Sequence, residues 1–152
     1  MKLSYAITVC NEFLEIQRLL PFIISNKRPQ DEIVVLVDLT KNSPTSELLG
    51  YLHKLSSNNH IILSEQNFNG DFARWKNILN NSCNGDYIFQ IDADEMPTEY
   101  MMKIIPQVIE SNDIDLKDKL LKVKDKLLNM GYDGENYSSD ISKIYDLNQS
   151  II

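Results

Sequence analysis

The chain has 152 residues, of which 43% are hydrophobic and 24% are charged, and its formal net charge is −7. This length and composition fit one soluble globular domain with its own hydrophobic core. The negative charge argues against a nucleic-acid backbone or an anionic membrane as the main partner, but not against a nucleotide held through a divalent cation.

The N-terminal sequence MKLSYAITVCNEF lacks the apolar core and the small-residue cleavage site of a signal peptide. No apolar run approaches the roughly 20 residues of a membrane span. We therefore expect a cytoplasmic protein without a transmembrane segment. The two cysteines, Cys10 and Cys83, belong to no Cys-x-x-Cys pair, so we expect reduced thiols and no disulfide framework.

The first part of the chain alternates between strand-like and helix-like segments. Residues 3–10 (LSYAITVC) and 32–38 (EIVVLVD) are apolar, β-prone runs, typical of strands that are covered on both faces. Between them, residues 12–24 place apolar side chains at helical spacing, with Asn11 as the expected cap. A second helix is expected in SPTSELLGYLHKL, with Ser43 as its N-cap and the following proline at its first position.

The alternation continues beyond the second helix. Residues 60–64 (HIILS) predict a short third strand, and residues 87–92 (YIFQID) predict a fourth. A helix over 72–82, capped by Asp71, is expected between them. A last helix is expected over 98–111, kinked or shortened by its internal proline. This order of elements predicts an α/β fold with a mostly parallel sheet flanked by helices.

Polar side chains follow three of the predicted strands: Glu12 the first, Asp38 the second, and Asp92 with Asp94 the fourth. Ligands of a parallel sheet bind beyond the carboxyl ends of its strands, so we expect these groups to meet in one crevice. Two carboxylates separated by one residue can reach one hard cation, and Mg²⁺ or Mn²⁺ bridges such groups to substrate phosphates. Small Ala93 leaves room for a nucleotide to pass. The alternative for these acids is a solvated turn at the end of a buried strand.

Four segments resemble, in order, motifs of the family 2 glycosyltransferases of the GT-A fold. The segment GDYIFQIDADE at 85–95 is similar to the signature Gly-(Asp/Glu)-Tyr-Ile…Asp-x-Asp. ITVCNE at 7–12 resembles the first-strand motif, which usually ends Tyr-Asn-Glu, and DEIVVLVDLTKNSPTSELL at 31–49 resembles the second-strand segment. FARWKNILNNSCNGDYIF at 72–89 resembles the helix with an Arg-Asn or Lys-Asn pair. The resemblance covers about residues 1–115 and implies a GT-A-like (Rossmann-like) domain that binds a nucleotide sugar.

The resemblance implies a role for each matching residue. Asp38 would bind the base or the ribose, Lys76 would reach the diphosphate, and Asp94 would be the main metal ligand, helped by Asp92. The cation, Mn²⁺ or Mg²⁺, would neutralise charge on the departing nucleoside diphosphate. The implied reaction moves a sugar from a nucleoside diphosphate sugar, a UDP-sugar first of all, to an acceptor with inversion. The implied nucleotide-binding residues are Thr8, Val9, Cys10, Glu12, Asp38, Lys76, Asp92 and Ala93.

Several of these residues also have purely structural interpretations. Cys10 stands where the family usually has tyrosine, so an expected stacking contact is lost and the thiol could simply belong to the core. Glu12 could only favour a helix N-terminus, and Asp38 could be a strand-end turn residue. Lys76 could belong to a solvated helix face. We expect Glu95 to lie outside the direct ligands of the metal.

The sequence changes character near residue 116. Residues 116–130 carry apolar side chains in a 4-3-4-3 spacing, which predicts an amphipathic helix ended by Gly131. We therefore divide the chain into a nucleotide-sugar-binding domain, 1–115, and a helical tail, 116–152, which stands where the family has its acceptor-binding half. The tail helix could cover an exposed part of the sheet or form a homodimer. No catalytic base is identifiable, and the acids that qualify by charge alone are Asp133, Glu135 and Asp140.

Three functions remain open from the sequence. The chain could be a short glycosyltransferase, alone or completed by another chain. It could be a truncated nucleotide-sugar-binding or interaction module with little or no catalysis. A flavodoxin- or receiver-like signalling module would need a phosphoacceptor aspartate on a central strand and a lysine on a later strand, and no later strand with such a lysine is evident.

Overall fold

The computed structural model describes residues 1–40 and 44–111. The predicted cap Ser43, the predicted tail helix at 116–130 and the acids of the tail lie outside the described residues. The chain divides into two compact units, Met1–Asp94 and Glu95–Ile152. The described part of the second unit is therefore residues 95–111.

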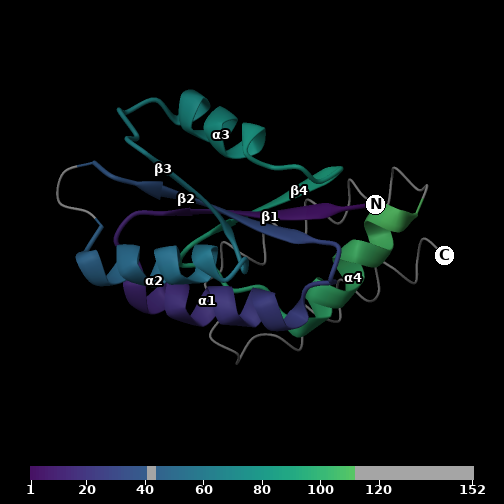
Figure 1. Ribbon diagram of the computed structural model, residues 1–152. Coiled ribbons are helices and arrows are strands. Elements are labelled where there is room, and N and C mark those ends of the chain that lie inside the picture. Colours follow the sequence, from purple (N-terminus) through teal and green to yellow (C-terminus); the bar gives the residue numbers. More distant parts are fainter. Residues whose placement is uncertain (41–43, 112–152) are drawn as a thin grey trace. The chain divides into compact units, whose positions relative to one another are not determined.

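The first unit is a four-stranded sheet with helices on both faces (Figure 1). Its strands lie in the order β3-β2-β1-β4, and every neighbouring pair is parallel. The α/β fold with a parallel sheet is therefore confirmed, although the third strand begins two residues later than predicted. The strands are β1 (Leu3–Val9), β2 (Glu32–Asp38), β3 (Ile62–Gln66) and β4 (Tyr87–Asp92).

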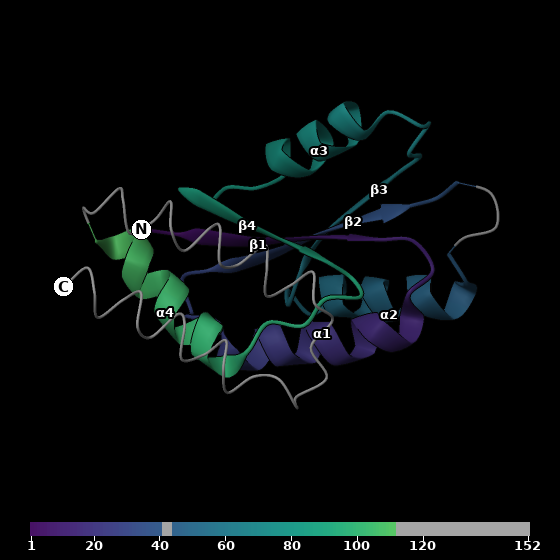
Figure 2. The ribbon, with the colours of Figure 1, turned by 180° about the vertical axis from the view of Figure 1, so that it is seen from behind.

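Each face of this sheet has its own helices. Figure 1 shows α1 (Phe13–Asn26) and α2 (Ser46–Ser57) along one face and α3 (Phe72–Asn81) on the other, and Figure 2 shows the same arrangement from behind. Successive side chains of a strand point to opposite faces, so even-numbered residues of β1 and β2 face α3. The core on that side consists of Ala6, Val34, Leu36, Trp75 and Leu79.

Helix α1 begins without the predicted cap. The N-cap residue is Glu12, whose side chain makes no cap hydrogen bond to the helix, so the prediction that Asn11 caps this helix is wrong. The Glu12 carboxylate instead turns back and accepts from the backbone N–H groups of Cys10 and Asn11, at 2.7 and 3.0 Å. These bonds shape the turn that leads into the helix, which leaves no N-cap role for Asn11.

Helices α2 and α3 each begin at a polar side chain that accepts a hydrogen bond from the first turn. Helix α2 begins at Ser46, not at Pro44, because Thr45 has the extended backbone of an N-cap and its hydroxyl accepts from the N–H of Leu48 at 3.2 Å. Helix α3 begins as predicted, since the Asp71 carboxylate accepts from the Arg74 N–H at 3.1 Å.

The described part of the second unit contains helix α4 (Glu99–Glu110). The Thr98 hydroxyl caps it by accepting from the N–H of Met101 at 2.9 Å. The helix continues past Pro106 to its end near the predicted boundary, so the proline does not shorten it. None of the helices within 1–40 and 44–111 combines the length and apolar character needed to cross a membrane.

A buried carboxylate near the amino ends of the strands joins β2, β1 and the turn before β4. Glu32 is 9% exposed. It accepts hydrogen bonds from the Ser4 hydroxyl at 2.7 Å and from the Asn84 N–H at 2.6 Å, and it pairs with the Lys2 ammonium at 2.9 Å. The Ser4 oxygen accepts in turn from the Gly85 N–H at 2.8 Å. These groups form the Glu32 network, which holds three chain segments in one register.

Gly85 lies so close to β1 that no side chain fits there. A Cβ atom on Gly85 would lie 2.6 Å from the Ser4 hydroxyl oxygen and 2.9 Å from the Lys2 carbonyl oxygen. Backbone would have to move to relieve such contacts. A Cβ atom on Gly50, inside α2, would have nothing within 4 Å.

This difference predicts opposite effects of the same substitution. Gly85→Ala should lower the free energy of unfolding by about 1–3 kcal/mol, because it crowds a packed backbone. Gly50→Ala should raise it by about 0.5–1 kcal/mol, because alanine stabilises an exposed helix position relative to glycine. Urea unfolding followed by circular dichroism measures both. A Gly85→Ala chain as stable as the wild type would contradict the close approach.

The Glu32 network also predicts a pH dependence of stability. Burial raises the pKa of Glu32, but the bonds from Lys2, Asn84 and Ser4 outweigh burial and lower the pKa from 4.5 to about 2. The unfolded chain therefore binds this proton more readily than the folded chain. The stabilising contribution is complete above about pH 4.5 and is lost as the pH falls toward 2.

We expect the difference in unfolding free energy between wild type and Glu32→Gln to be constant from about pH 7 to 5 and to shrink below that, by roughly 3 kcal/mol at most. Urea unfolding at a series of pH values measures it. A difference that is as large at pH 3 as at pH 7 would show that Glu32 is not held as the carboxylate.

Candidate functional site

The register of the sheet brings the strand-end polar groups to one place. Thr8 of β1 pairs with Leu36 of β2 on one side and with Asp92 of β4 on the other. Asp38 follows Leu36 by two residues and so has the same orientation. The side chains of Thr8, Asp38 and Asp92 therefore lie on the α3 face, at the carboxyl ends of three neighbouring strands.

A cavity of about 360 Å³ lies at these carboxyl ends. The strand ends supply one part of its wall, and α3 with the loop before it supplies the other. Seven of the eight predicted nucleotide-binding residues meet here, and their roles stay predictions. The lining residues are Thr8, Val9, Cys10, Glu12, Asp38, Phe68, Phe72, Trp75, Lys76 and Asp92.

Ala93 and Asp94 lie in the turn that follows β4 and do not line the cavity. Ala93 is buried, whereas Asp92 and Asp94 are both exposed. Among the described residues, no group of three or more His, Cys, Asp or Glu side chains could hold a metal ion. Two exposed carboxylates nevertheless fit Mg²⁺ or Mn²⁺, because such ions take their remaining ligands from substrate phosphates and water.

Asp38 joins the end of β2 to the loop before α3. Its Oδ1 atom accepts from the N–H of Thr40 at 2.8 Å and from the N–H of Phe68 at 3.1 Å, and also from the Thr40 hydroxyl. Burial raises the pKa of Asp38, but these hydrogen bonds outweigh it and lower the pKa below its usual value. Asp38 is therefore an ionised group that holds one wall of the cavity in place.

Sequence reasoning missed the aromatic part of the cavity. The ring of Phe68 packs edge-on against two others, with its centroid 4.7 Å from that of Phe72 and 5.6 Å from that of Trp75. Trp75 is 6% exposed, whereas Phe72 is 72% exposed. The signal lay in NFNGDFARWK, where three aromatic residues precede Lys76. Helical spacing predicts that Phe72 and Trp75 lie on one side of the helix. It does not predict the position of Phe68, which lies in the loop before the helix.

Both cysteines are free thiols, as expected. Cys10 lines the cavity at the position where the family usually has tyrosine. Burial and the negative charge of Glu32 raise the pKa of Cys83, so this thiol stays protonated at neutral pH and is a poor nucleophile.

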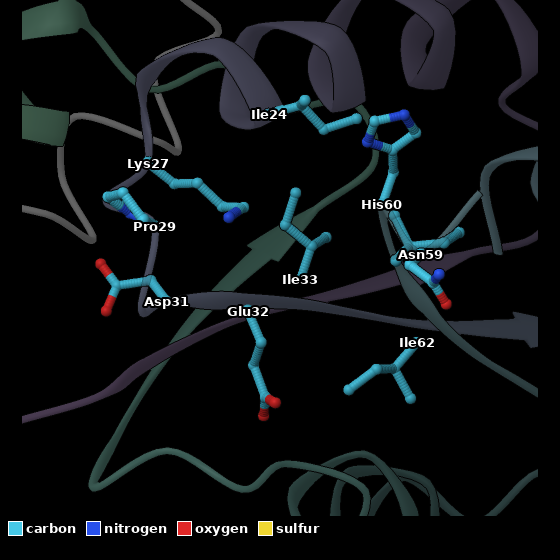
Figure 3. A pocket seen from close by; sticks show the side chains of 10 residues that line it. Ile24, Lys27, Pro29, Asp31, Glu32, Ile33, Asn59, His60 and Ile62 are labelled. Atoms are coloured by element: carbon cyan, nitrogen blue, oxygen red, sulfur yellow. The ribbon is translucent and has the colours of Figure 1, made fainter.

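A second cavity, of about 380 Å³, lies at the amino ends of β2 and β3 (Figure 3). Figure 3 shows Glu32 pointing away from Lys27 and His60, which lie across β2 from it. Asp31 accepts from the Leu3 N–H and from the Arg28 guanidinium, both at 2.9 Å. Ligands of a parallel sheet bind beyond the carboxyl ends of its strands, so position and not size favours the cavity at those ends.

A family model described as "Glycosyl transferase family 2" matches residues 4–135. This match extends beyond residue 115, the limit of the resemblance expected from the sequence motifs. A search of curated proteins finds no significant match.

Solved structures of TarS from S. aureus are similar in fold. TarS 1–349 matches at 20% identity with a TM-score of 0.60, over 72% of this chain and 32% of that chain. TarS 1–349 in complex with UDP matches at 19% identity with a TM-score of 0.60 and the same coverage. A longer TarS chain matches at 20% identity with a TM-score of 0.60, over 72% of this chain and 20% of that chain. The present chain thus spans about a third of TarS 1–349, and the likeness supports the predicted GT-A-like fold.

The bonds of Asp38 predict a local effect of its removal. Asp38→Ala should speed hydrogen exchange of the Thr40 amide by about tenfold, because this amide loses an acceptor worth roughly 1.5 kcal/mol. The Phe68 amide should respond less, because its N–H also donates to the Thr40 hydroxyl oxygen at 3.3 Å. Asp38→Asn keeps an oxygen at Oδ1 and is the matched control, with a smaller effect expected. Exchange rates measured by mass spectrometry or NMR check this. Unchanged rates in Asp38→Ala would show that the loop is held by other contacts.

Proposed function

The chain belongs to glycosyl transferase family 2, and on this basis we propose that it transfers a sugar from a nucleoside diphosphate sugar to an acceptor. The observation that carries the proposal is the cavity at the carboxyl ends of β1, β2 and β4. It combines carboxylates, a lysine and aromatic rings. In a nucleoside diphosphate sugar, a lysine and a carboxylate-bound cation would attract the negative diphosphate, and an aromatic ring would contact the flat face of the base.

The cavity residues, together with Asp94 in the turn after β4, would contact different parts of such a ligand. Lys76 would pair with the diphosphate, and Asp92 and Asp94 would hold a divalent cation, Mn²⁺ or Mg²⁺. When bound, this cation would offset the negative charge of the departing nucleoside diphosphate. Asp38 would bind the base or the ribose. The TarS complex with UDP supports a uridine nucleotide as the first one to test.

Catalysis also needs a base that takes the proton of the acceptor hydroxyl, if the sugar is transferred with inversion as the resemblance implies. Among the described residues, no side chain is identified for this role. The proposal therefore concerns donor binding and the departure of the nucleoside diphosphate. The proposed location is cytoplasmic, and a homodimer through residues 116–130 stays a prediction that light scattering tests.

A second candidate function is a nucleotide-sugar-binding module that does not transfer the sugar. It rests on the proposed donor cavity alone, since no side chain among the described residues is identified as the catalytic base. Release of the sugar into water or onto an acceptor separates an enzyme from such a module.

The metal part of the proposal predicts nucleotide binding that depends on a cation. Calorimetry with UDP and GDP, with and without Mn²⁺, should show binding that is stronger with the metal. Asp94→Ala should weaken the metal-dependent binding by at least about tenfold, because it removes the proposed main ligand.

The matched control for this variant is Glu95→Ala, which removes the next acid in the sequence and should leave binding within about twofold of wild type. Equal losses in the two variants would point to general charge and not to a metal ligand. Absence of binding by both nucleotides would overturn the proposed donor site.

A further inference from the structure

Phe72 is the most exposed apolar side chain of the cavity. It is 72% exposed although it lines the cavity, and it is the first residue of α3. The two aromatic side chains beside it are less exposed, since Phe68 is half-buried and Trp75 is buried. A large aromatic ring left open at the mouth of a cavity provides a surface that a flat ligand group can cover.

The ring of Phe72 has a fixed support. Phe68 packs edge-on against it at 4.7 Å between centroids. The backbone N–H of Phe68 donates to the carboxylate of Asp38 at 3.1 Å, and the Phe68 ring also packs edge-on against Trp75. The loop residue behind Phe72 is thus tied both to the end of β2 and to the core under α3, which favours a preformed surface for a ligand.

Strand order places this support at one side of the cavity. Asp92 ends β4 and Asp38 ends β2, and β1 lies between these two strands. Phe68 is bonded to Asp38, and Phe72 packs against Phe68, so this pair of rings is linked to the Asp38 side. Lys76 lies one helical turn beyond Phe72, about 6 Å along the helix axis. A ligand whose diphosphate reaches Lys76 and the Asp92 side would therefore direct its base toward Asp38 and Phe72.

We infer that the ring of Phe72 stacks on the base of the bound nucleotide, an inference that rests on the proposed function. Stacking on an aromatic ring holds a base through its flat face and tolerates changes in its polar edges. Cys10 stands at the position where the family usually offers tyrosine for a stacking contact. Phe72 supplies a ring to the same cavity from the α3 side.

The test compares a ligand that has a base with one that lacks it. Wild type and Phe72→Leu are titrated with UDP and with inorganic pyrophosphate, each in the presence of Mn²⁺. Trp75 is the single tryptophan of the chain and lines the cavity, so its fluorescence reports occupancy, and calorimetry gives the affinity. Phe72→Leu should bind UDP about tenfold more weakly and pyrophosphate within about twofold of wild type.

Two further variants separate stacking from a general loss of apolar surface. Phe72→Tyr keeps the ring and should bind UDP within about twofold of wild type. Leu14→Ala removes an apolar side chain that is 74% exposed on α1 and does not line the cavity, and it should leave UDP binding unchanged. Because Phe72 is so exposed, Phe72→Leu should fold normally, which circular dichroism checks.

The outcomes separate this inference from the proposed function. Wild type that binds UDP, together with Phe72→Leu that binds it equally well, overturns the stacking and leaves the donor site intact. Equal weakening of UDP and pyrophosphate in Phe72→Leu also overturns it, because the ring would then act on the whole cavity and not on the base. Wild type that binds neither UDP nor pyrophosphate overturns the donor site and the stacking together.

Discussion

The Glu32 carboxylate joins β2 to β1 and to the turn before β4, near the amino ends of these strands. Glu32 bonds to Ser4 of β1 and to the N–H of Asn84, and Ser4 bonds to the N–H of Gly85. The three segments thereby start in a fixed alignment. A shift of one strand by one residue would turn all its side chains to the other face of the sheet. The alignment at one end of the strands therefore decides which groups meet at the other end.

The strand-end carboxylates at that other end have structural contacts of their own. Glu12 accepts from two backbone N–H groups of the turn after β1, and Asp38 accepts from the N–H groups of Thr40 and Phe68. Asp38 is thus a strand-end turn residue, and Glu12 fixes the turn before α1 without making a cap bond to the helix N-terminus. Each carboxylate therefore has a structural role. It does not compete with a role in binding, because a carboxylate that fixes a loop also fixes its own position. A ligand then meets a wall that is already ordered, and little freedom is lost on binding.

The sequence predicts the strands and the convergence of their ends, but not the loops. Continuous apolar runs such as EIVVLVD identify buried strands, and the parallel order of strands then brings Thr8, Asp38 and Asp92 together. The position of Phe68 depends instead on long-range bonds and on a loop in which Asn69 and Gly70 have positive φ angles of 57° and 76°. Local spacing carries no such information. The wrong cap at Asn11 has a different cause, because the competing residue is its neighbour: the longer Glu12 side chain reaches back to the N–H groups of Cys10 and Asn11.

The charges of the cavity give a reason for its proposed dependence on a cation. Glu12, Asp38 and Asp92 line it, with Lys76 as the cation among its lining residues, and the whole chain carries a net charge of −7. A nucleoside diphosphate would bring further negative charge to the same place. Close like charges in a partly desolvated site repel strongly unless an opposite charge lies between them. A divalent ion at Asp92 and Asp94 would reverse the local field, so that the carboxylates which would repel a bare diphosphate would hold the ion that attracts it. The aromatic side of the cavity is independent of this balance, because stacking on a base involves no net charge. Two parts of one ligand would thus be bound by different physical interactions, and the cavity provides both.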